Sequence, residues 1–116
     1  MTNEIPDYLI SAAASDTMHF AKRIGSKLFT LNLAELSFNM EGNEEAKLVC
    51  MECKLVCEKL MARLVESTKL INAFRQGLDV SEADIRNIIK VNADIDSQLK
   101  EVGPVIDNLE RAMQYM

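Results

Sequence analysis

The sequence predicts an all-α fold, an elongated up-down bundle of three long helices. Through most of the chain, apolar residues recur at alternating steps of three and four, which is the spacing of an amphipathic helix. The composition agrees, because 48% hydrophobic and 27% charged residues with only four glycines and two prolines are typical of a folded helical protein. At 116 residues there is room for one helical-bundle domain, which we expect to span residues 1–116.

The first helix is expected to run from near Pro6 toward Met40. Proline suits the first turn of a helix, and Asp7 is favourable beside the positive end of the helix dipole. The sequence Glu-Gly-Asn at residues 41–43 is expected to stop the helix.

The apolar residues of this first helix form two stripes. One runs from Leu9 through Phe20 to Leu31, and the other begins at Phe29, more than a third of the way round the helix. Either the helix breaks near residues 30–32, which would give a fourth helix, or one long helix turns a second apolar side toward a partner. The second stripe comprises Phe29, Leu33, Leu36 and Met40.

Clear start and stop signals bound the other two helices. The second is expected to begin at Glu44 and to end just before Gly77, a residue type common at helix C-termini. The third begins after Ser81, which forms a capping box with Asp84. Pro104 lies inside this last helix, removes one backbone hydrogen bond and predicts a kink.

Both later helices carry an unbroken buried seam, which favours packing at a shallow angle. In an up-down bundle, Ser67 and Asn92 of these seams fall at the level of Thr17 in the first helix. We interpret the three as a polar core layer that sets register. The seams consist of Cys50, Cys53, Cys57, Leu60, Leu64, Ser67, Ile71 and Phe74 in the second helix, and of Ile85, Ile88, Asn92, Ile95, Leu99, Val102, Ile106, Leu109, Met113 and Met116 in the third.

Three cysteines, Cys50, Cys53 and Cys57, lie along one stripe of the second helix. An odd number of cysteines so close together argues against a disulfide framework and favours a reducing cytoplasm. A tetrahedral zinc site needs four ligands around one ion, and the outer pair is two turns apart. We therefore expect the thiols to pack as core residues. Metal binding by this stripe is the second alternative function, and no metal or other cofactor is expected.

The charge balance excludes several function classes. A net charge of −5 disfavours binding to nucleic acid or to anionic membranes, which both require a basic surface. The N-terminal segment has no basic region before an apolar run, so a signal peptide is not expected, and no apolar run approaches the length of a membrane span. No phosphate-binding loop, metal motif or nucleophile elbow is present in the sequence, so an enzyme is not expected.

His19 is the only histidine, and the helical spacing places it off the apolar stripe, with Lys22 one turn later on the same side. We expect it to be at least half exposed. The simplest interpretation is a surface residue. An exposed imidazole beside a cation is also the arrangement that accepts a phosphoryl group.

Residues 18–41 resemble histidine-containing phosphotransfer domains. Those domains carry a histidine followed by lysine three residues later, and then a leucine-rich segment ending in Leu-Glu. His19 and Lys22 are followed here by Leu28, by Leu-Ala-Glu-Leu at 33–36 and by Met-Glu at 40–41. The resemblance implies that His19 is the phosphorylated residue and that Lys22 supports it electrostatically.

These observations lead to a ranked set of functional hypotheses. The first is a non-enzymatic bundle that binds another protein, as an adaptor, chaperone or inhibitor, with a homodimer as a further possibility. The phosphorelay carrier is the alternative. The expected partner-binding residues are Phe29, Leu33, Leu36, Met40, Leu48 and Leu55.

Overall fold

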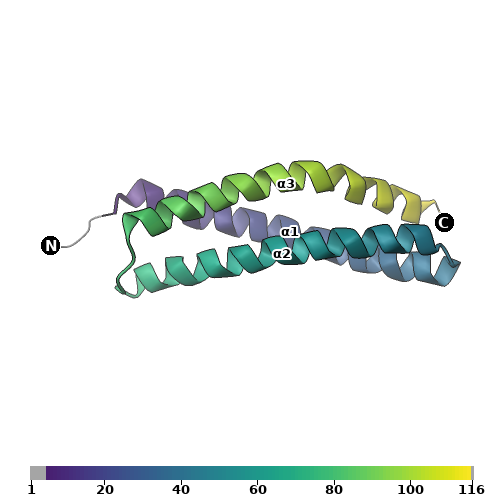
Figure 1. Cartoon of the computed structure of the whole chain (residues 1–116), viewed down its shortest axis with the longest axis horizontal. Helices are drawn as coiled ribbons and strands as arrows, with labels where there is room; N and C mark the ends of the chain where they lie inside the picture. The colour runs from purple at the N-terminus through teal and green to yellow at the C-terminus, as the bar shows by residue number, and fades with distance from the viewer. Residues whose placement is uncertain (1–4, 116) are drawn as a thin grey trace.

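The protein is an elongated up-down-up bundle of three helices, as predicted (Figure 1). The computed structural model describes residues 5–115 and measures 63 × 20 × 16 Å along its principal axes. The helices are α1 (Asp7–Glu41), α2 (Glu44–Arg75) and α3 (Glu82–Gln114). α2 runs back against α1, and α3 runs in the same direction as α1 (Figure 1). Within residues 5–115, no helix is long and apolar enough to cross a membrane.

α1 is one continuous helix, so the predicted alternative of a break near residues 30–32 and a fourth helix is wrong. The buried stripe does not end at Leu31, because Ala34 and Phe38 continue it at steps of three and four and are almost completely buried. The second stripe, which begins at Phe29, is therefore an additional surface of a straight helix.

The two turns depend on glycine. Gly42 has φ 73° and Gly77 has φ 79°, a left-handed conformation that residues with a side chain rarely adopt. At the first turn the N–H of Asn43 donates to the carbonyl of Phe38 at 2.9 Å, and the second turn closes in the same way. Before α3, the predicted capping box between Ser81 and Asp84 is present.

The core is divided into two apolar clusters. The larger occupies the half of the bundle near the α1–α2 turn and includes Leu31, Cys57 and Ile95. The smaller occupies the other half and includes Ala13 and Ile85. Thr17, Ser67 and Asn92 are buried between the two clusters, one from each helix.

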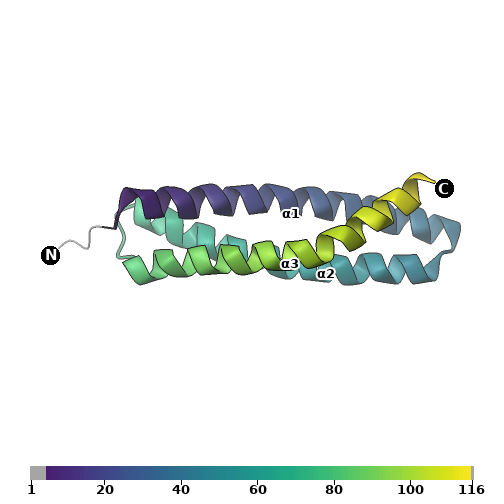
Figure 2. The same ribbon diagram turned by 90° about the horizontal axis from the view of Figure 1, so that it is seen from above.

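α3 continues through Pro104 to Gln114, and its last turns leave the line of the first part (Figure 2). The proline has no N–H for the carbonyl of Lys100, which permits this bend. Gly103 is buried where the helix bends, whereas Pro104 faces solvent. The predicted kink is thus a bend in one continuous helix.

Candidate functional site: the outward side of helix α1

The second stripe of α1 lies in solvent. Phe29 is 66% exposed, Leu33 44%, Leu36 58% and Met40 78%, although all four are large apolar side chains. At about 100° per residue they lie on the side of the helix opposite the buried residues Leu31, Ala34 and Phe38. α1 therefore presents apolar residues both to the core and to solvent.

This outward side is a continuous row along α1. Its members follow one another at steps of three or four, and all are exposed. Lys22 is the only charged residue among them. We use the term outward side of α1 for the row Tyr8, Ser11, Ser15, Met18, Lys22, Gly25, Phe29, Leu33, Leu36 and Met40.

Leu48 and Leu55 form a separate surface on α2. They are 56% and 52% exposed and lie opposite the buried side of their own helix. Because α1 and α2 both turn their buried sides toward the common core, their outward sides point in different directions. The structure thus groups the four α1 residues and does not bring Leu48 and Leu55 into the same row.

Two exposed methionines were missed by the sequence reasoning. Met18 is 60% exposed on the outward side of α1, and Met51 is 44% exposed near Leu48 and Leu55 on α2. On α2 the sequence carried a signal, because Met51 follows Leu48 by three residues and precedes Leu55 by four.

One ion pair and one hydrogen bond join α1 and α2 beside the stripe. The Nζ of Lys54 donates to the Oε2 of Glu35 at 2.7 Å in a half-buried contact, and the Nζ of Lys47 donates to the Oδ1 of Asn39 at 2.9 Å. These contacts fill the α1–α2 junction. The apolar side chains of the α1 stripe therefore lie outside this junction and face solvent.

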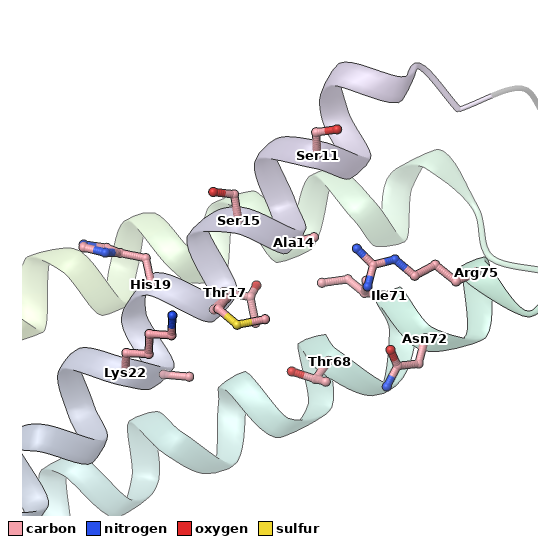
Figure 3. Close-up of a pocket in the computed structure, with 12 residues that line it drawn as sticks. Ser11, Ala14, Ser15, Thr17, His19, Lys22, Thr68, Ile71, Asn72 and Arg75 are labelled. Atoms are coloured by element: carbon pink, nitrogen blue, oxygen red, sulfur yellow. The ribbon is translucent and has the colours of Figure 1, made fainter.

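A groove of about 720 Å³ lies between the first half of α1 and the last part of α2. Its lining includes Lys22, His19 and Arg75, and it includes no carboxylate. In the close-up, the guanidinium group of Arg75 is directed into the space between the helices, and the ring of His19 points away from it (Figure 3). The groove is thus a locally cationic region of an acidic protein.

His19 is exposed, and its ring lies edge-on to that of Phe20 with centroids 5.4 Å apart. Lys22 is exposed one turn later. Arg23, in contrast, is engaged, since it lies over the Phe20 ring and pairs with Asp96 at 3.9 Å. Among the residues described, His19 and Lys22 make no hydrogen bond or ion pair, so both side chains remain accessible to an incoming group.

The three thiols are buried and face the core. Burial raises the pKa of Cys50 and of Cys57 to about 11, and it also raises the pKa of Cys53. Buried, protonated thiols are poor metal ligands and poor nucleophiles. No group of three or more His, Cys, Asp or Glu side chains in the described part of the chain is arranged to hold a metal ion.

The polar layer is only partly satisfied. The amide of Asn92 donates from Nδ2 to the Oγ1 of Thr17 at 3.2 Å, while its Oδ1 has no hydrogen-bond partner. Ser67 is buried at the same level. A buried acceptor without a partner costs stability, so this layer is a weak point of the core.

Comparisons with protein-family models, with curated proteins and with solved structures found no match to this chain.

Proposed function

We propose that this protein is a non-enzymatic binding module that docks a protein partner on the outward side of α1. One observation carries the proposal: between Tyr8 and Met40 this side holds a single charge, and its last third holds four exposed large apolar residues. Complete burial of one such side chain is worth about 1.5–3 kcal/mol. Covering the four would therefore contribute several kcal/mol to binding.

The shape of the surface favours a helical partner. A straight helix with apolar residues at steps of four, three and four presents a seam into which the side chains of another helix can pack. Adaptors, chaperones and inhibitors can all use such a surface. With the partner on α1, Leu48 and Leu55 on α2 would either make a separate contact with it or take no part in binding.

The test is an affinity purification of the tagged protein from its own host, with variants in parallel. We expect Leu33→Asp and Leu36→Asp each to abolish capture of the partner. Leu78→Asp is the matched control, because Leu78 is 59% exposed but lies in the α2–α3 connection. Circular dichroism must show unchanged helix content in all variants. Capture that survives in both α1 variants would contradict the proposal.

The alternative is phosphoryl transfer through His19. The accessibility of His19 and Lys22 and the absence of carboxylates from the lining of the adjoining groove support it. An acid-labile phosphohistidine should form on the protein in the presence of a sensor kinase and disappear in His19→Gln. Partner capture that is identical in the wild type and in His19→Gln, with no labelling, would eliminate this alternative.

A further inference from the structure

We infer that the partner on the outward side of α1 is a second copy of this chain, with the two α1 helices packed antiparallel about a two-fold axis near Leu33. The inference rests on the proposed function, because it uses the same surface and names its occupant. Three separate features of α1 support it: the arrangement of the apolar residues, an exposed glycine and the distribution of charge.

The apolar stripe is complementary to itself. Its members are separated by four, three and four residues, and this order reads the same in both directions. In an antiparallel pair centred near Leu33, Phe29 of one copy lies level with Leu36 of the other. A two-fold axis makes this contact twice, as in most homodimers.

No contact within the single chain explains why residue 25 is a glycine. It lies in the middle of α1 on the outward side, and a Cβ added there would meet nothing within 4 Å. Glycine inside a helix costs about 1 kcal/mol relative to alanine. In the proposed packing Gly25 lies level with Met40 of the other copy, whose bulky side chain needs that space.

The charges are also complementary. Lys22 is the only charge on the outward side, and Glu41, Glu44 and Glu45 are exposed at the α1–α2 turn. None of the four takes part in an ion pair within residues 5–115. Glu41 is moreover unfavourable where it stands, in the last turn of a helix that has no basic residue there. The antiparallel register places Lys22 level with the α1–α2 turn of the other copy, where these glutamates lie.

The paired segment is long enough for a specific contact. From Lys22 to the end of α1 at Glu41 the pairing extends over roughly 28 Å at 1.5 Å per residue. That is nearly three heptads, and on each side of the axis it holds one apolar contact, one size-matched contact and one charged contact. Leu48 and Leu55 lie outside this interface.

The experiment is sedimentation equilibrium of the purified full chain over the micromolar range. We expect a monomer–dimer equilibrium that Leu36→Glu weakens at least 100-fold, roughly the loss of two central apolar contacts. Lys22→Glu should weaken the dimer about tenfold, since each reversed pair occurs twice. The double variant Glu44→Lys/Glu45→Lys should weaken it similarly. Combining it with Lys22→Glu should restore the dimer, which a merely unfolded variant could not do.

Gly25→Leu tests the size match. A Cβ at this exposed position meets nothing within 4 Å in the single chain, so the helix content should remain, but the dimer should be lost. Ala93→Leu, on the outward side of α3, is the matched control and should leave the dimer intact.

Each outcome decides a separate point. A wild-type chain that stays monomeric throughout the range would overturn the inference and leave the proposed function to its own test in the host. A dimer that tolerates both Lys22→Glu and Gly25→Leu would overturn the antiparallel packing.

Discussion

The outward side of α1 and the outward sides of α2 and α3 have the same task in a single bundle, which is to face water, yet their compositions differ. α2 and α3 expose acidic and basic residues along their whole lengths. The outward side of α1, from Tyr8 to Met40, exposes one lysine. The exposed charged residues on the outward sides are Glu44, Glu52, Glu58, Lys59, Glu66 and Lys69 on α2, and Arg86, Lys90, Asp94, Lys100, Glu101 and Arg111 on α3.

The difference shows that α1 is not adapted to solvent alone. Helices that pack on an apolar core normally have one apolar and one charged side. α3 follows this pattern, and α2 does so as well, although Leu48, Met51 and Leu55 are exposed among the charged residues of its outward side. Large contiguous exposed apolar surfaces usually mark contacts with other molecules. In this bundle α1 is thus the helix that packs inward and also offers a second contact surface.

The largest expected effect separates the two sides of α1. Leu31→Ala should lower the free energy of unfolding by about 2–5 kcal/mol, because Leu31 is completely buried and the change leaves a cavity. Leu33→Ala, two residues later and 44% exposed, should lower it by less than about 1 kcal/mol. Urea unfolding of the two variants, at concentrations where the chain is monomeric, gives the comparison. Equal losses would mean that Leu33 belongs to the core.

The second prediction concerns the inner side of α2, where buried thiols replace the charged residues of its outward side. The pKa of Cys50 and Cys57 is raised from 9.0 to about 11 by burial, so the folded chain at pH 10 holds protons that the unfolded chain has lost. The free energy of unfolding should therefore fall as pH rises from 9 to 11, by on the order of 1 kcal/mol per thiol at pH 10, with no contribution below 9. The double variant Cys50→Ala/Cys57→Ala should lack this part of the fall in urea titrations. An identical pH dependence in the variant would show that the thiols are accessible to water.

The third prediction concerns the polar residues that are buried inside the bundle. Thr17→Val/Asn92→Leu removes the buried hydrogen bond together with the unpartnered Oδ1 of Asn92. We expect the free energy of unfolding to rise by about 1 kcal/mol, because an incompletely satisfied buried polar pair is replaced by apolar contacts. Thermal unfolding followed by circular dichroism measures it. A large loss of stability would show that the layer is fully satisfied in solution.

The smallest effect concerns Gly25. In the monomer, Gly25→Ala should raise the free energy of unfolding by about 0.5–1 kcal/mol, because alanine is the better helix former and the Cβ has open space. Urea unfolding under dilute conditions tests this. A loss of stability would indicate a close contact at Gly25 within the single chain.

Much of the fold follows from local rules. The seams of α2 and α3, apart from Met116, which lies outside the described residues, and the capping box at Ser81 were predicted, because each depends on residues a few positions apart. The alternative of a break near residues 30–32 was wrong, and it was left open because of Ala34, which is small. Ala34 did not stand out as a core residue, although it links Leu31 to Phe38 on the buried side.

The surfaces were harder to predict. Phe29 and Leu36 could be assigned to one stripe from their spacing alone. That Leu48 points elsewhere depends on how α1 and α2 pack, which no single helix encodes. The groove beside Lys22 and Arg75 likewise requires residues from two helices that are more than fifty positions apart in the chain.

The polar layer has a consequence for the way the bundle opens. Thr17, Ser67 and Asn92 interrupt apolar contact across all three helices, so the two clusters on either side are joined by backbone but by few side chains. Cooperative opening units often end at such discontinuities. Amide protons in the first turns of α1 and the last turns of α2 should therefore exchange with solvent as one group, ahead of those around Leu31 and Ile95. The end of the bundle that carries the smaller cluster would then open transiently, while the half that presents the α1 stripe stays closed.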